Sequence, residues 1–86
     1  MFKSTLFVVI GLLAPSLAWA ERPGNDWITM TKAEQILNTV GGYKLITKIE
    51  ADDGRWEGKG LKEDGFRYKF RVDPQSGEIT KDQRDD

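Results

Sequence analysis

The spacing of hydrophobic positions changes twice along the 86-residue chain. Residues 1–20 are mainly apolar and contain 14 of the hydrophobic side chains. Between residues 30 and 40 hydrophobic positions recur about every 3.6 residues, which is typical of an amphipathic helix. From residue 43 to residue 72 they recur at every second position, the spacing of strands with one buried face. The pattern therefore predicts an apolar leader, one helix and a series of strands.

The predicted helix has a single apolar stripe. Its members are Met30, Ala33, Ile36, Leu37 and Val40. A threonine hydroxyl can accept a hydrogen bond from the free N–H groups of a first turn, so Thr29 or Thr31 can begin the helix. Gly41-Gly42 ends it, because glycine adopts the left-handed conformation that closes many helices. A helix of about three turns is unstable alone and must pack on the strands.

Turn sequences divide the second half of the chain into strands. The strands are expected at Tyr43–Ala51, Arg55–Leu61, Phe66–Val72 and, as a short edge strand, Glu78–Lys81. Asp53-Gly54 is the strongest turn signal, because a type I′ turn requires positive φ at both central residues. Residues 63–65 and 73–77 have the composition of longer turns.

The turn lengths determine which residues lie opposite each other. A two-residue turn at Asp53-Gly54 pairs Ala51 with Trp56, and a three-residue turn at 63–65 pairs Gly58 with Phe70. One face then carries Leu45, Thr47, Ile49, Ala51, Trp56, Gly58, Gly60, Phe66, Tyr68, Phe70 and Val72. The two glycines on this face leave room for close approach of the helix. The predicted fold class is α+β, with one N-terminal helix packed on a three- to four-stranded antiparallel β-meander.

The first 20 residues have the parts of a secretory signal peptide. Lys3 supplies a positive charge, residues 6–13 form an apolar run, and Ala18-Trp19-Ala20 places small residues before Glu21. We expect cleavage between Ala20 and Glu21 and a soluble, periplasmic product. The alternative, an uncleaved membrane anchor, is disfavoured because a span needs about 20 apolar residues.

The composition changes after residue 20. Only 19 of the last 66 residues are hydrophobic, which predicts a thin core and modest stability. Trp27 and Trp56 are expected to fill much of that core, with an exposed binding patch as the alternative. The same 66 residues carry 12 basic and 14 acidic side chains, a balance that disfavours nucleic acid as a partner. We expect a flexible lead-in at 21–26, a folded domain at 27–81 and a disordered charged tail at 82–86.

Few residues are candidates for catalysis. The chain has no Cys and no His, which excludes thiol chemistry, disulfides and the usual zinc sites. Ser76 is expected to form a turn. Asp52 and Asp53 could act as an acid–base pair or bind a hard cation with Glu50, but the turn accounts for Asp53 and the spacing is not that of a calcium loop. We therefore expect no enzymatic activity, no catalytic residue, no metal and no cofactor.

Most strand residues that point away from the helix are basic. This face is expected to carry Lys44, Ile46, Lys48, Glu50, Arg55, Glu57, Lys59, Leu61, Arg67, Lys69 and Arg71. Glu57 should lie opposite Arg71, and Lys59 opposite Lys69. The face is either an ordinary solvated surface or a docking surface, and the edge strand at 78–81 is the other candidate for docking. The candidate contact residues are Lys59, Arg67, Lys69, Arg71 and Glu57.

Several short motifs follow one another in a characteristic order. They are Trp27-Ile28-Thr29, Gly42-Tyr43, Ile49-Glu50, Asp53-Gly54, Trp56-Glu57, Asp64-Gly65 and Val72-Asp73-Pro74-x-x-Gly77-Glu78-Ile79. Together they resemble the PepSY domain family, in its small, single-domain exported form, over residues 27–80. The chain departs from the usual pattern at Gly58 and Gly60, where larger residues are expected, so the packing of the core differs there.

The resemblance implies a binding protein. PepSY domains occur in the propeptides of secreted metallopeptidases and in stand-alone exported proteins, where they are proposed to restrain proteases. It implies a non-enzymatic periplasmic modulator or inhibitor whose partner is an envelope protein, such as a protease. The alternative is an envelope accessory or sensor that binds an anionic ligand or a lipid headgroup through its basic face. A small hydrolase is a third, weaker hypothesis.

Overall fold

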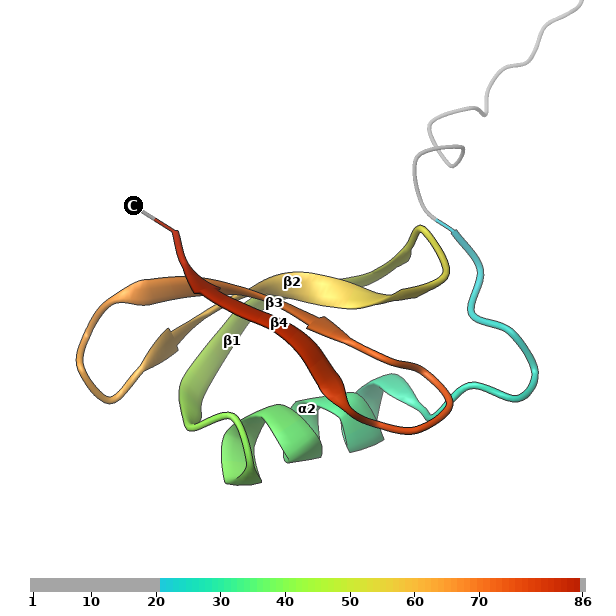
Figure 1. Ribbon diagram of the computed structural model, residues 1–86, viewed down its shortest axis with the longest axis horizontal. Coiled ribbons are helices and arrows are strands. Elements are labelled where there is room, and N and C mark those ends of the chain that lie inside the picture. The colour runs from blue at the N-terminus through green and yellow to red at the C-terminus, as the bar shows by residue number, and fades with distance from the viewer. Residues whose placement is uncertain (1–20, 86) are drawn as a thin grey trace, which may run out of the picture.

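The computed structural model describes residues 21–85 as one helix and a four-stranded sheet. The elements are α2 (Met30–Thr39), β1 (Tyr43–Asp52), β2 (Arg55–Lys62), β3 (Arg67–Val72) and β4 (Ile79–Arg84). The strands pair antiparallel in the order β1-β2-β3-β4, and α2 packs on one face of the sheet (Figure 1). This confirms the α+β class with four strands. The helix is not N-terminal in the chain, because it begins only at Met30.

The signal peptide predicted for residues 1–20, with its cleavage site after Ala20, lies outside the described residues. Between residues 21 and 85, no helix has the length and apolar character needed to cross a membrane. Residues 21–26 form neither helix nor strand. Hydrogen bonds hold this segment against the domain: the backbone N–H of Glu21 donates to Ala51 O at 3.3 Å, and Gln75 donates to the carboxylate of Asp26 at 2.6 Å.

Thr29 is the threonine that begins α2. Its backbone is extended and its hydroxyl accepts a hydrogen bond from the backbone N–H of Lys32 at 3.0 Å, which satisfies one of the free donors of the first turn. Ala33 and Leu37 are fully buried against the sheet. The chain turns away from the helix at Gly42, which has φ = 76°.

The first hairpin has the predicted turn and register. Asp53 and Gly54 both have positive φ, at 56° and 78°, as a type I′ turn requires. Ala51 lies opposite Trp56, and Gly58 lies opposite Phe70 on the next strand. The Asp53-Gly54 turn therefore aligns the core side chains of β1 and β2, and the turn at residues 63–65 aligns those of β2 and β3.

The first half of β1 differs from the simple alternation. The register with β2 shifts between Tyr43 and Leu45 and again between Ile46 and Lys48, so β1 carries extra residues at two irregular points. Each extra residue moves the following side chains to the other face. The prediction that Leu45 and Thr47 face the core is therefore wrong: Leu45 is 52% exposed, and Ile46 packs against the core instead.

The last strand is longer than the predicted edge strand. Strand β4 continues to Arg84, so the disordered tail predicted for 82–86 is wrong for residues 82–84. Asp82 explains much of this extension, because its carboxylate accepts from the Tyr43 hydroxyl at 2.8 Å and pairs with Lys62 Nζ at 2.7 Å. Burial and this hydrogen bond raise the pKa of Tyr43 well above its ordinary value, so the hydroxyl remains a donor.

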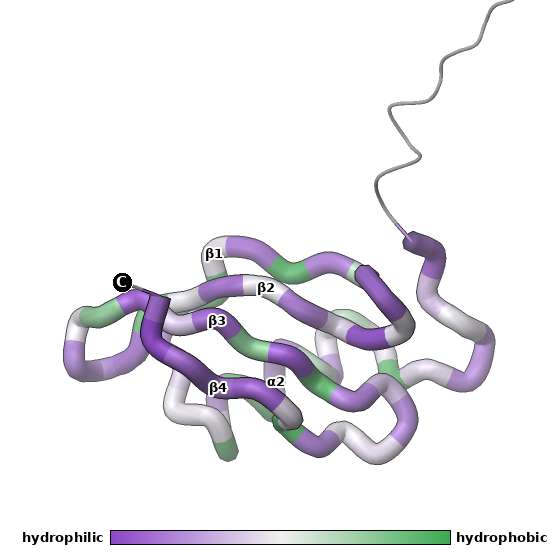
Figure 2. The backbone as a smooth tube through the Cα atoms, turned by 45° about the horizontal axis from the view of Figure 1, so that its top comes forward, coloured by the Kyte–Doolittle hydropathy of each residue, from purple (hydrophilic) through white to green (hydrophobic). Residues whose placement is uncertain are grey.

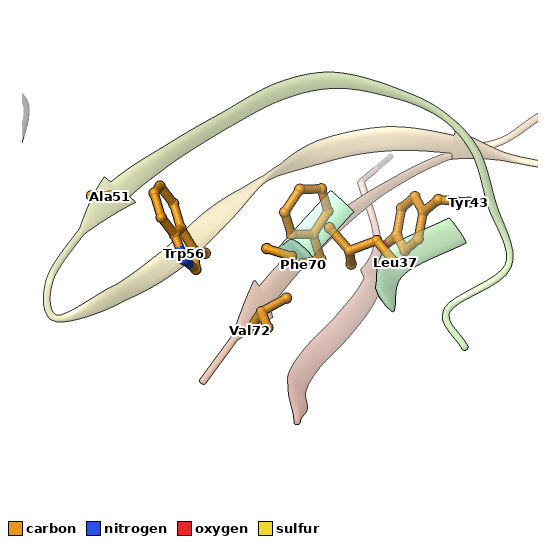
Figure 3. Close-up of a cluster of buried hydrophobic side chains, with 7 residues drawn as sticks. Leu37, Tyr43, Ala51, Trp56, Phe70 and Val72 are labelled. Atoms are coloured by element: carbon orange, nitrogen blue, oxygen red, sulfur yellow. The ribbon is translucent and has the colours of Figure 1, made fainter. Parts of the chain in front are cut away.

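The core lies in one layer between α2 and the sheet. Its buried residues are Ala33, Leu37, Tyr43, Ala51, Trp56, Phe70 and Val72, and six of them are labelled in Figure 3. Trp27 packs edge-on against Trp56 with ring centroids 5.4 Å apart, and Trp56 donates to Ile28 O at 3.0 Å. Trp56 is therefore part of the core, and Trp27 packs against it. Phe66 does not, contrary to the prediction, because it is 47% exposed and lies beneath the guanidinium of Arg84.

Gly58 and Gly60 permit close contact between two strands. A Cβ on Gly58 would collide with the carbonyl oxygen of Lys48 and lie 2.9 Å from the Cα of Ile49. A Cβ on Gly60 would lie 2.5 Å from the carbonyl oxygen of Leu45. The element that uses the space above these glycines is the irregular strand β1, whereas the sequence pattern suggested the helix.

Candidate functional site

The outer face is the side of the sheet away from α2. Three lysines on neighbouring strands lie side by side there, because Lys48 is opposite Lys59 and Lys59 is opposite Lys69. We call Lys48, Lys59 and Lys69 the lysine row. Next to it lies a second row of Glu50, Glu57, Arg71 and Lys81, again one residue from each strand. Charged residues thus occupy the middle of this face, and Figure 2 shows hydrophilic segments on all four strands.

The two rows enclose a shallow groove of about 210 Å³. Its charged lining consists of Lys48, Lys59, Lys69, Arg71, Lys81, Glu50 and Glu57, and Gly58 and Phe70 complete the lining. Five basic side chains therefore surround two acidic ones, although the whole chain has a net charge of −1. The sheet concentrates positive charge in the groove, because the residues between these charged positions point to the core.

Ion pairs hold several of these side chains in place. Arg71 Nε lies 3.4 Å from Glu57 Oε1, and Lys48 Nζ lies 3.5 Å from Glu50 Oε2. A carboxylate from beyond β4, that of Asp85, lies between the other two members of the lysine row. Its oxygens are 3.5 Å from Lys59 Nζ and 3.7 Å from Lys69 Nζ.

Three carboxylates meet at the acidic end of the groove. Glu50, Asp52 and Glu57 each place an oxygen within 4.8 Å of the others. Partial burial, and then a hydrogen bond with Asp52, raise the pKa of Glu57, and the cations of Arg71 and Arg55 oppose this shift. Hard cations prefer oxygen ligands of this kind, so these carboxylates are the ones that could hold a metal. Asp53 is not among them: it lies in the hairpin turn and pairs with Arg55 at 3.1 Å.

The remaining candidate for chemistry, Ser76, forms a turn. Its hydroxyl accepts from the backbone N–H of Glu78 at 3.1 Å, and its own N–H donates to Asp73 at 2.9 Å. The backbone N–H groups of Ser76 and Gln75 lower the pKa of Asp73 by stabilising its charged form. These contacts show that the side chains of Ser76 and Asp73 stabilise the turn after β3.

The structure brings together four of the five predicted contact residues. Glu57, Lys59, Lys69 and Arg71 all line the groove. Arg67 lies outside it, where its carbonyl accepts from the N–H of Asp85 at 2.9 Å.

Four further residues belong to the site: Lys48, Glu50, Lys81 and Asp85. The alternation of β1 placed Lys48 and Glu50 on this face, and Lys81 could have been selected from its place in the predicted edge strand. Asp85 gave no signal, because a run of polar residues at the end of a chain predicts disorder.

Comparison with known proteins identifies the family. The family model PepSY_2, described as "Peptidase propeptide and YPEB domain", matches residues 3–83. This match is wider than the motifs at 27–80 and includes almost the whole chain. No curated protein and no solved structure matches the chain.

Proposed function

The chain belongs to the PepSY_2 family, and from this membership we propose that it is a non-enzymatic regulatory protein that binds and restrains an envelope protease. PepSY domains are associated with protease propeptides and inhibitor-like regulation. A domain of this kind acts by occupying a surface of its partner and needs no catalytic group. The proposal assigns the contact to the groove on the outer face.

The observation that carries this assignment is the lysine row. Lys48, Lys59 and Lys69 lie side by side on three strands, in a groove with five basic and two acidic side chains. These side chains are not needed for the core, so the surface can be used for recognition. Charges arranged in this way steer an acidic partner and select it against others.

The same positive charge supports a second candidate function. An envelope accessory or sensor protein could bind a small anion or a lipid headgroup in the groove. The excess of basic side chains favours this function, whereas the two glutamates in the groove disfavour a flat anionic surface.

We also propose that the protein acts in the periplasm after removal of residues 1–20. The leader has the pattern of a signal peptide, and the new N-terminus would be Glu21. The intact mass of protein recovered from the envelope fraction tests this. A mass that includes residues 1–20 would contradict it.

The test of function is capture of a protease together with its inhibition. We expect the tagged protein to retain a peptidase from an envelope extract of the source cell and to lower the caseinolytic activity of that extract. A variant with Lys59→Ser, Lys69→Ser and Arg71→Ser should capture about tenfold less, because close charge pairs at interfaces contribute strongly to binding. Its melting temperature should change little, since exposed ion pairs contribute about 1 kcal/mol or less.

A second triple variant controls for the loss of charge. Arg22→Ser, Lys32→Ser and Lys44→Ser remove the same charge outside the groove, at exposed positions. This variant should capture and inhibit like the wild type. Unchanged peptidase activity with the wild-type protein would contradict protease regulation, and equal capture by both variants would exclude the groove as the contact.

A further inference from the structure

The lysine row is unfavourable for the sheet that contains it. Like charges directly opposite each other on neighbouring strands destabilise the pair, and this row has two such pairings. The side chains point away from the core, so packing does not require lysine at these positions. Lys59 and Lys69 are each 47% exposed, which leaves both ammonium groups accessible from the groove.

A carboxylate of the chain itself lies between two of these lysines. The side chain of Asp85 is only 22% exposed and contacts both Lys59 and Lys69. Its backbone N–H donates to Arg67 O, which holds the residue beside β3. In Figure 1 the end of β4 rises on the side of the sheet opposite α2, in agreement with this position on the outer face. The contact shows which chemical group the lysine row accepts.

We propose that the lysine row is a subsite for the carboxylate side chains of an acidic peptide segment, and that Asp85 occupies it as an internal competitor in the free protein. The proposal rests on the proposed function and specifies the chemistry of the partner. A carboxylate of the partner replaces that of Asp85 between Lys59 and Lys69. The displaced carboxylate of Asp85 then becomes hydrated. Because the partner must displace Asp85, this residue weakens the binding of the partner peptide without preventing it.

The groove fits a peptide better than a membrane. A membrane surface has a diffuse negative charge, which Glu50 and Glu57 beside the lysine row would repel. A peptide carries its charges at defined intervals, so it can place acidic side chains over the lysine row and neutral ones over the two glutamates. Charge complementarity therefore favours an acidic peptide segment as the occupant.

The test is direct binding of a labelled acidic peptide. The probe is a fluorescein-labelled peptide of alternating glutamate and serine, and the readout is fluorescence anisotropy with the purified protein. Asp85→Asn should tighten the Kd about two- to fivefold, the range of ion pairs at a protein surface. Lys59→Gln combined with Lys69→Gln should weaken it about tenfold or more, and raising the salt concentration should weaken wild-type binding steeply.

Asp53→Asn is the matched control. It removes the same charge in the β1–β2 turn, where Asp53 pairs with Arg55, and asparagine tolerates the positive φ at this position. Its Kd should equal that of the wild type. Equal tightening by Asp53→Asn and Asp85→Asn would overturn the competitor role, because net charge would then explain both. Absence of peptide binding would overturn the subsite, and binding to phosphatidylglycerol vesicles alone would assign the groove to lipid headgroups.

The peptide assay contains no protease, so its result does not depend on whether the proposed function is correct. Peptide binding without inhibition of a protease would support the carboxylate subsite and contradict protease regulation. Inhibition of a protease without peptide binding would leave the regulatory function in place and overturn the subsite.

Discussion

Replacing Phe70 with alanine is expected to remove a large part of the free energy of unfolding of the domain. Phe70 is 1% exposed and lies between the other core side chains in Figure 3. The centroid of its ring lies 5.3 Å from that of the Tyr43 ring. Large-to-small replacements of a buried Phe cost about 3–5 kcal/mol, whereas a domain of this size has a free energy of unfolding of roughly 3–10 kcal/mol. A thermal melt followed by circular dichroism should lose its cooperative transition or move down by more than about 15 °C.

Phe66→Ala is the matched control for this change. It removes the same ring from a position that is 47% exposed, where the main contact is with the guanidinium of Arg84. The expected loss is below about 1 kcal/mol, the range of an exposed cation–π contact. Similar melting temperatures for the two variants would show that the alternating face of β3 is not the core.

Gly58→Ala should be the second most damaging single change. The added Cβ would lie 2.7 Å from the backbone carbon of Lys48 and 2.9 Å from the Cα of Ile49. Backbone atoms cannot rotate away as a side chain can, so β1 must separate from β2 to admit the methyl group. The expected cost is about 3 kcal/mol, at the upper end for overpacked sites. Chemical denaturation monitored by tryptophan fluorescence measures it.

Gly54→Ala is the control for Gly58→Ala, because it separates the cost of a steric clash from the cost of an unfavourable backbone conformation. A Cβ on Gly54 would meet no atom within 4 Å beyond its chain neighbours, but the residue has φ = 78°. The change therefore costs only the left-handed backbone conformation, about 1 kcal/mol. If Gly58→Ala were no worse than Gly54→Ala, the close approach of β1 to β2 would be wrong.

The sequence predicted the parts of the fold that local chemistry determines. Asp53-Gly54 specified a two-residue turn, and that turn aligned Ala51 with Trp56. The clean alternation from Tyr68 to Val72 then identified both faces of β3. These features depend on a few neighbouring residues, so a pattern can reveal them.

Features that depend on distant contacts could not be predicted from the pattern. The irregular points in β1 arise where its backbone passes over Gly58 and Gly60, and alternation alone gives Leu45 the wrong face. The length of β4 depends on Asp82, which is held by Tyr43 and Lys62 from β1 and β2. Charged residues at the end of a chain predict disorder until such partners are known.

The candidate site was predictable to the extent that the strands were regular. Alternation along β2 and β3 placed Glu57, Lys59, Lys69 and Arg71 on one face. Their cross-strand pairing follows from the length of the turn at residues 63–65. The contribution of Asp85 required the three-dimensional structure, because it comes from a part of the chain 26 positions beyond Lys59.

The most direct test of the outer face as the contact surface is lysine footprinting of the captured complex. Acetylation followed by mass spectrometry compares each lysine in the free and the bound protein, and Lys32 on α2 is an internal reference at an exposed position. We expect that Lys48, Lys59, Lys69 and Lys81 become protected on binding while Lys32 reacts at the same rate. Protection of Lys32 with unchanged reactivity of the four groove lysines would contradict a contact through the outer face.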